Sequence, residues 1–240
     1  MVDPSGWMPG AEKIETSAWG YPDLGEEQMY PQAVVNHVAQ GYMQGLINIA
    51  QSPDPGKSWH FSVGRDGRIV QHVSIWNPAW HAGDVNAPSW PLYADLAAQL
   101  GRSNPNRMTI GIEQEGFSVD PGYAYDYIYD AEHPWPEAQI ASLIKIHEWF
   151  FGACGWLKGK GDADHVITHS MLNARSRAQD PGDFWLATVR PRILAALQPG
   201  AIPGPSTASY DSGYADGRRD GRAAMLDAVA AAVEALRAQP

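Results

Sequence analysis

Two histidines, His37 and His169, stand where metal ligands or catalytic bases converge in sheet-based proteins. Each ends a short β-favouring run, at residues 33–37 and 166–169, and the chain changes direction after it. Asp180 precedes a Pro-Gly pair that would hold its carboxylate at a sharp turn. Two imidazoles and one carboxylate leave a fourth tetrahedral position open for water, as in catalytic zinc sites. The spacing from His169 to Asp180 is unspecific by itself, so a metal site is one hypothesis among several.

Four further histidines are expected to be structural or exposed to solvent. His147 falls on the apolar face of a predicted helix and is interpreted as a packing residue. His72 lies on a hairpin strand, His133 stands beside a proline, and His165 opens a strand and is expected at the surface. Cys154 is the only cysteine, which excludes an internal disulfide and any zinc site built from several thiolates. It follows a helix, so we expect a buried apolar residue and not a nucleophile.

Hydrophobic periodicity predicts the elements that must position these side chains. Asp66-Gly67 between two alternating runs, 59–63 and 69–73, is typical of a β-hairpin. The clearest helix is 136–151, with an apolar face and a proline suited to its first turn. The other predicted elements are strands at 33–37, 108–113 and 166–169 and helices at 41–50, 92–100 and 184–197, the last interrupted at Pro191. Strands mixed with helices indicate an α/β fold with a mixed central β-sheet flanked by helices.

Composition and charge limit the classes of protein that this chain can belong to. Hydrophobic residues make up 44% of the 240 positions and charged residues 18%, which is enough for a packed core. The formal net charge is −10, so we expect no nucleic-acid partner, because phosphate binding needs a basic surface. No window reaches the roughly 18 apolar residues of a membrane span, and no signal peptide is recognisable. We therefore expect synthesis in the cytoplasm, with release by another agent if the protein acts outside the cell.

Six segments in order, within residues 30–198, resemble the zinc-dependent N-acetylmuramoyl-L-alanine amidases. This family includes phage endolysins, bacterial cytoplasmic muropeptide amidases and animal peptidoglycan recognition proteins. The matching segments are Val34-Val35-Asn36-His37, the hairpin from Trp59 to Gln71, Ala79-Trp80-His81-Ala82-Gly83, Ile110-Gly111-Ile112-Glu113-Gln114-Glu115-Gly116, Thr168-His169 and Asp180-Pro181-Gly182. The resemblance implies a mixed sheet covered by helices, a Zn²⁺ cofactor, and hydrolysis of the amide between the lactyl group of N-acetylmuramic acid and L-alanine of the peptidoglycan stem peptide.

The resemblance also implies roles for individual residues. His37, His169 and Asp180 would be the zinc ligands, and Zn²⁺ would polarise the amide carbonyl and lower the pKa of its bound water. Glu113 would take the proton of that water and pass one to the departing amine. Glu115 shares the strand face of Glu113 if the strand stays extended, so an exchange of their roles is left open.

Departures from the family pattern concern the cation and the aromatic residues of the site. Many members carry a lysine two residues before the last ligand, where this chain has Ala178. Arg177 could occupy its place beside the developing oxyanion. Trp59 stands where short phage amidases have a tyrosine, and it could stack on sugar or peptide. Trp80 and His81 would line the cleft and contact the substrate, or else pack within the protein.

The domain organisation changes once along the chain. Residues 1–198 are predicted to form the catalytic domain, and the Pro-, Gly- and Ser-rich segment 199–209 a linker. The tail, 210–240, has glycines at every fourth position from Gly213 to Gly221, followed by an alanine-rich stretch. Small residues at this spacing permit close helix approach. The tail is expected to self-associate or contact the cell wall as a helix, or to remain a marginal solvated helix.

The leading functional hypothesis is an endolysin-type zinc amidase that reaches the cell wall of its host after the membrane is breached. Two alternatives remain open on the sequence. A non-catalytic peptidoglycan-binding module with the same fold is disfavoured because all three presumed ligands are present. A cytoplasmic amidase that recycles soluble muropeptides would use the same chemistry in another setting.

Overall fold

A six-stranded sheet forms the centre of the computed structural model, which describes residues 5–17, 29–53, 56–101, 103–118, 128–157 and 159–198. Its strands are β1 (Glu12–Lys13), β2 (Ala33–Val38), β3 (Phe61–Val63), β4 (Ile69–Gln71), β5 (Thr109–Gln114) and β6 (Val166–Thr168). Their order in the sheet is β1-β4-β3-β5-β2-β6. Strands β3 and β4 are antiparallel, whereas the other neighbours are parallel. The predicted hairpin and the mixed α/β sheet are both confirmed.

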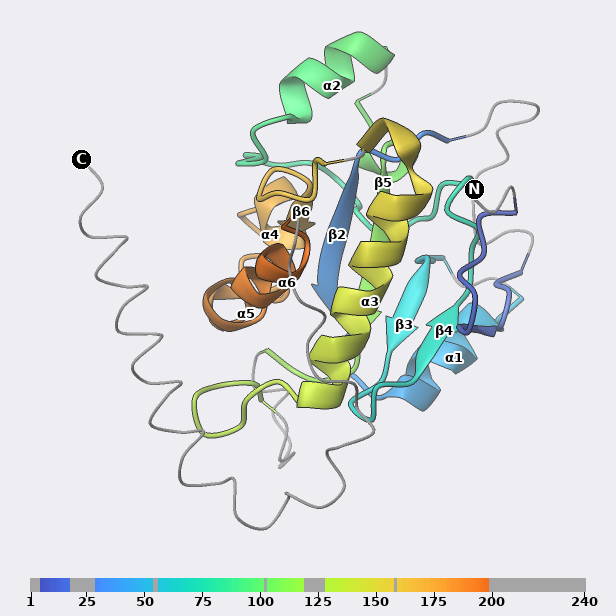
Figure 1. Cartoon of the computed structure of the whole chain (residues 1–240), viewed down its shortest axis with the longest axis vertical. Helices are drawn as coiled ribbons and strands as arrows, with labels where there is room; N and C mark the ends of the chain where they lie inside the picture. Colours follow the sequence, from blue (N-terminus) through green and yellow to red (C-terminus); the bar gives the residue numbers. More distant parts are fainter. Residues whose placement is uncertain are drawn as a thin grey trace.

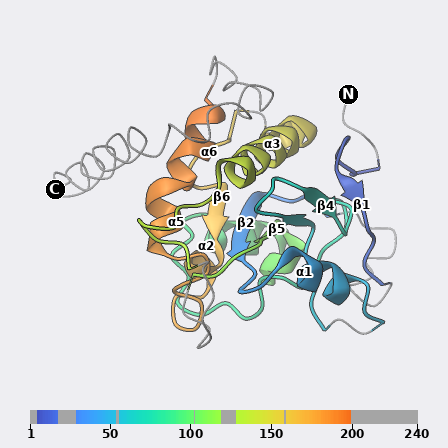
Figure 2. The ribbon, with the colours of Figure 1, turned by 90° about the horizontal axis from the view of Figure 1, so that it is seen from below.

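Helices cover both faces of this sheet. They are α1 (Met43–Ala50), α2 (Tyr93–Leu100), α3 (Glu137–Ala153), α4 (His169–Leu172), α5 (Asp183–Thr188) and α6 (Arg190–Ala196), with two 3₁₀ turns, η1 (Pro105–Arg107) and η2 (Gly155–Leu157). The long helix α3 runs across one face of the sheet (Figure 1). Figure 2 shows α6 on the same side as α3 and α1 on the opposite side. The predicted final helix is divided in two at Val189, with Pro191 in the first turn of α6.

The main core lies between α3 and the sheet. The side chains of Ile140, Leu143, Ile146 and Phe150 are buried on α3 and belong to the same cluster as strand residues such as Ile112. Strands β2 and β5 are buried along almost their whole length, as expected for central parallel strands with both faces covered. Cys154 is buried in this cluster, as predicted.

Three parallel strands bring their carboxyl ends to one edge of the sheet. In the register, His37 of β2 is the partner of Glu113 of β5, and Asn36 of β2 is the partner of Thr168 of β6. The residues that end or follow β5, β2 and β6 are therefore neighbours in space. In open α/β sheets this edge is where ligands bind.

His147 is a packing residue of α3, as predicted. Its ring is fully buried, with Nδ1–H donating to the carbonyl of Leu143 over 2.7 Å and Nε2 accepting from the amide of Asn36 over 3.3 Å. A neutral imidazole has one donor and one acceptor, so these two bonds are satisfied together only in the uncharged ring. Burial lowers the pKa of His147 to about 4. By contrast, His165 is buried and bonded to Asp162, which corrects the expectation of surface exposure.

Acidification should destabilise the protein through His147. The unfolded chain takes up a proton near pH 6.5 and the folded chain only near pH 4, so stability present above about pH 6.5 is lost towards pH 4. Between pH 7 and pH 5 this side chain should cost about 2 kcal/mol of unfolding free energy. Urea titrations at both pH values should show a smaller loss for His147→Gln. The exposed control His133→Gln should keep the wild-type loss; identical losses in all three proteins would refute the assignment.

The predicted linker 199–209 and tail 210–240 lie outside the described residues, so the proposed division at residue 198 and the self-association of the tail stay predictions. Within the part of the chain that the structure describes, we find no helix with the length and apolar character to cross a membrane.

Candidate metal centre and catalytic cleft

His37, His169 and Asp180 meet at the carboxyl edge of the sheet. His37 is on β2, His169 is the first residue of α4 directly after β6, and Asp180 lies in the segment before α5. One ligand atom from each lies within 4.8 Å of the others. Oδ2 of Asp180 is 2.9 Å from Nδ1 of His169 and 3.5 Å from Nδ1 of His37. The structure thus brings together the three residues that the sequence suggested as metal ligands.

The Asp180 carboxylate is held in place from β2. Its Oδ1 accepts a hydrogen bond from the backbone N–H of Val38 over 2.9 Å, which leaves Oδ2 directed at the histidines. Burial acts to raise the pKa of Asp180, but protons on the Nδ1 atoms of His37 and His169, which a metal ion would displace, outweigh it, and the pKa lies well below the usual range. Asp180 is therefore ionised at neutral pH.

The donor atoms of this cluster fit a metal ion. Nε2 of His169 is bonded to the carbonyl of Ala82 over 2.8 Å, and Nε2 of His37 to Nδ1 of His81 over 3.2 Å. The two Nδ1 atoms and Oδ2 of Asp180 remain to face one another. Burial lowers the pKa of His37, which favours the neutral, metal-binding form. Two nitrogens and one carboxylate oxygen, each held by a hydrogen bond on its other side, are the types of ligand that a catalytic zinc site uses.

Glu113 stands beside this cluster at the end of β5. Its Oε2 is sealed from solvent and has no hydrogen-bond partner among the described residues. Burial and the charge of Asp180 raise the pKa of Glu113 to about 8, while Lys57 and Arg177 act to lower it. A carboxyl group that lines a cleft and has a pKa raised in this way is suited to proton transfer.

Glu115 is directed to a different place. Strand β5 ends at Gln114, so Glu115 lies just beyond the strand, with its backbone N–H bonded to the carbonyl of Val63 over 2.9 Å. Oε2 of Glu115 accepts from the backbone N–H of Arg65 over 2.9 Å, and Glu115 is absent from the residues that line the cleft. Of the two glutamates, only Glu113 lines the cleft beside the His37–His169–Asp180 cluster.

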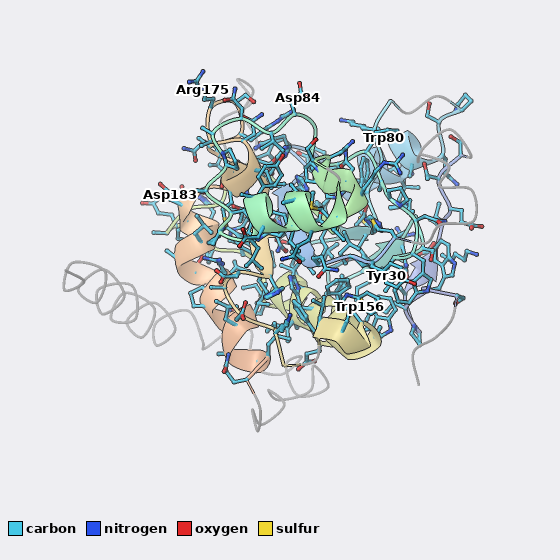
Figure 3. The ribbon with its side chains drawn as sticks, turned by 90° about the horizontal axis from the view of Figure 1, so that it is seen from above. Tyr30, Trp80, Asp84, Trp156, Arg175 and Asp183 are labelled. Carbon is cyan, nitrogen blue, oxygen red and sulfur yellow. The ribbon has the colours of Figure 1, made fainter. Side chains whose placement is uncertain are left out.

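A cleft of about 900 Å³ contains the cluster and Glu113. Three cations, Lys57, Arg175 and Arg177, line it together with Trp80, although the whole chain is acidic. Figure 3 shows Arg175 and Trp80 along one side of the molecule, with Trp156 on the opposite side. Sequence reasoning missed Lys57, because nothing local marks a lysine that only the tertiary structure brings beside Glu113.

The aromatic residues predicted to bind substrate occupy different environments. Trp80 has 40% of its surface exposed and lines the cleft, so it can contact a ligand. Trp59 also borders the cleft, but it is 2% exposed and packs in a cluster with α1, and its indole N–H donates to Ser62. His81 is buried against His37. Of Trp59, Trp80 and His81, Trp80 is therefore the one with an exposed side-chain surface that a substrate could contact.

Residues 27–183 match the family described as N-acetylmuramoyl-L-alanine amidase. The chain belongs to this family. The amidase is 28% identical over 162 residues to N-acetylmuramoyl-L-alanine amidase A of Achromobacter lyticus, covering 64% of this chain and 77% of that protein. It is 26% identical over 179 residues to the 1,6-anhydro-N-acetylmuramyl-L-alanine amidase AmpD of Haemophilus influenzae, covering 74% and 80%. These relatives support the conclusion that the amidase is an enzyme and not a binding module alone.

A solved structure, the selenomethionine derivative of AmpD, has the same fold as the amidase. The TM-score is 0.53, with 23% sequence identity, 81% of this chain covered and 99% of the other. At this level of identity the likeness concerns the arrangement of strands and helices, which confirms the predicted fold class.

Proposed function

We propose that the amidase hydrolyses the bond between N-acetylmuramic acid and L-alanine of the peptidoglycan stem peptide with Zn²⁺ held by His37, His169 and Asp180. The convergence of their three donor atoms within 4.8 Å carries the proposal. Family membership supports the substrate and the bond. Zn²⁺ bound there would polarise the scissile carbonyl and lower the pKa of a water molecule.

The other residues of the cleft handle protons and substrate. Glu113 accepts a proton from the attacking water and returns a proton to the departing amine of L-alanine. Its ionised form is needed for the first step, and the positive charges of Lys57 and Arg177 lower its pKa in that direction. Trp80 offers an exposed indole to the sugar or peptide beside the reacting amide.

Lys57 and Arg177 supply the positive charge that the family lysine would supply at position 178. Both line the cleft and both act electrostatically on Glu113. Lys57→Met and Arg177→Met should each lower kcat, and the double variant should lower it by about 100-fold or more, the usual cost of removing an oxyanion donor. Steady-state kinetics on a soluble muropeptide measures the effect. The control Arg192→Met removes a distant cation paired with Glu137 and should retain wild-type kcat. A double variant with wild-type kcat would exclude this role.

The decisive test of the reaction is the identity of the bond that is cut. Purified peptidoglycan digested with the amidase should release stem peptides with a free L-alanine amino group, detected by mass spectrometry. The same digest with metal-stripped protein should release none, and added Zn²⁺ should restore release. Cleavage within the peptide or the glycan would refute the proposed bond, and undiminished release without metal would refute the metal.

The biological setting has two candidates with the same chemistry. We propose an endolysin-type enzyme that is made in the cytoplasm and acts on the cell wall. The predicted linker and tail support this setting. The similarity to the Haemophilus influenzae relative, which is named a 1,6-anhydro-N-acetylmuramyl-L-alanine amidase, supports the alternative that the substrates are soluble anhydromuropeptides. Rates on intact cell walls and on soluble anhydromuropeptides separate the two. Turnover confined to soluble fragments would refute the endolysin proposal.

A further inference from the structure

In both metal-binding histidines, the ring nitrogen that faces away from Asp180 contacts the same short loop, residues 81 and 82. Nε2 of His37 meets the ring of His81, and Nε2 of His169 meets the carbonyl of the next residue, Ala82. These contacts lie on the far side of each ring from Asp180. Whatever holds residues 81 and 82 therefore orients both histidines together.

The ring of His81 has a defined proton arrangement. Its Nε2 is 3.3 Å from the carbonyl oxygen of Thr109 and 3.4 Å from the hydroxyl of the same residue. That hydroxyl donates its hydrogen to the carbonyl of Pro105, so towards His81 it can only accept. Both neighbours of Nε2 are acceptors, and Nε2 of His81 must carry the proton. In the neutral ring Nδ1 is then an acceptor.

This arrangement determines the tautomer of His37. Because Nδ1 of His81 accepts, Nε2 of His37 must donate to it, so in the neutral, metal-binding ring Nδ1 of His37 carries the lone pair on the side of Asp180. His169 follows the same rule, since the carbonyl of Ala82 only accepts and Nε2 must donate. Gly111 leaves room for the His81 ring: a Cβ there would lie 2.5 Å from Cγ of His81.

Asn106 holds the loop itself. Its Oδ1 accepts from the backbone N–H of His81 over 3.0 Å and from that of Ala82 over 2.8 Å. Asn106 is 3% exposed, and its own N–H is bonded to the side chain of Asn104 at the start of η1. One buried amide oxygen thus anchors both residues that orient the histidines.

We propose that Asn106 and His81 form a positioning unit that sets the proton-bearing nitrogen of both metal-binding histidines, His37 through the His81 ring and His169 through the Ala82 carbonyl. The inference rests on the proposed metal site. It gives His81 a role that differs from the substrate contact suggested by its place in the sequence. Outer partners of ligand histidines keep the ligating nitrogen aimed and unprotonated.

Zn²⁺ affinity of the metal-free protein, measured by competition with a chromogenic chelator, tests the unit without reference to turnover. His81→Phe and Asn106→Ala should each weaken Zn²⁺ binding about 10- to 100-fold, the usual effect of losing an outer partner. His81→Asn keeps an acceptor near the position of Nδ1, and Asn106→Asp keeps the oxygen acceptor, so each should recover affinity relative to its disruptive counterpart. The core variant Ile193→Ala loses packing away from the cleft and should bind Zn²⁺ like the wild type.

The tautomers provide a second readout. In Zn²⁺-loaded protein with ¹⁵N-labelled histidine, long-range ¹H–¹⁵N spectra should show His37 and His169 protonated at Nε2. Protonation at Nδ1 of either ring, or wild-type affinity in both His81→Phe and Asn106→Ala, would overturn the positioning unit. A wild-type protein that binds no Zn²⁺ would refute the proposed metal site itself, so the two failures are distinct. Equal loss of affinity in Ile193→Ala would show a general stability effect and also overturn the proposal.

Discussion

Asp180→Asn should abolish amidase turnover and weaken Zn²⁺ binding by more than about 100-fold, beyond the usual cost of losing an outer partner. The substitution preserves the shape of the side chain and an oxygen that can accept from Val38. It removes the negative charge that lies between His37 and His169. A divalent cation loses its only anionic ligand among the three, so affinity falls even though the fold is kept. Chelator competition and metal analysis of the purified protein measure the loss.

Asp183→Asn is the matched control for Asp180→Asn. Asp183 is exposed in the first turn of α5, three residues along the chain, and takes no part in the cleft. It should keep both Zn²⁺ affinity and turnover. Turnover retained in Asp180→Asn at limiting Zn²⁺ would show that Asp180 is not a ligand.

Glu113→Gln should lower kcat by about 10²- to 10⁴-fold, the usual contribution of a general acid–base residue. An amide cannot accept a proton from water at neutral pH, but it matches the size of the carboxyl group. Stability should be unchanged or higher, because the substitution removes a group whose ionisation is disfavoured by burial and by Asp180. Stopped assays on a soluble muropeptide and urea titration, run on the same preparation, measure the two effects.

Glu115→Gln is the control for this substitution. Its amide oxygen can still accept from the N–H of Arg65, and Glu115 does not line the cleft. It should retain wild-type kcat. A large loss in Glu115→Gln together with an active Glu113→Gln would reverse the assignment of the two glutamates. Loss of kcat together with loss of stability in Glu113→Gln would indicate a structural role instead.

Much of the fold follows from local patterns in the sequence. The alternating runs around Asp66-Gly67 predict the β3–β4 hairpin, and the apolar spacing over 136–151 predicts α3. The break at Pro191 predicts the division of the last helix. Propensity, turn chemistry and periodicity act over a few residues, so they can be read from the chain itself. The predicted surface exposure of His165 was wrong, because its environment depends on how β6 enters the sheet.

The side chains that could bind a metal, His37, His169 and Asp180, are evident in the sequence from their type, position and family resemblance. How they meet depends on the tertiary structure. The hydrogen bond from Val38 to Asp180 joins residues 142 positions apart in the chain. The pairing of β2 with β5 and β6 sets the relative positions of His37, Glu113 and His169. Such distances depend on strand order and register, which no local signal encodes.

Tertiary structure also decided the identity of the groups around the presumed metal. It separated Glu113, which lines the cleft, from Glu115, which bonds to the backbone of Arg65, and it brought Lys57 to the cleft from a distant loop. It placed His81 behind His37, where hydrogen bonds determine which nitrogen faces Asp180. A sequence specifies the kinds of donor and acid, whereas protonation states depend on burial and on partners that folding supplies.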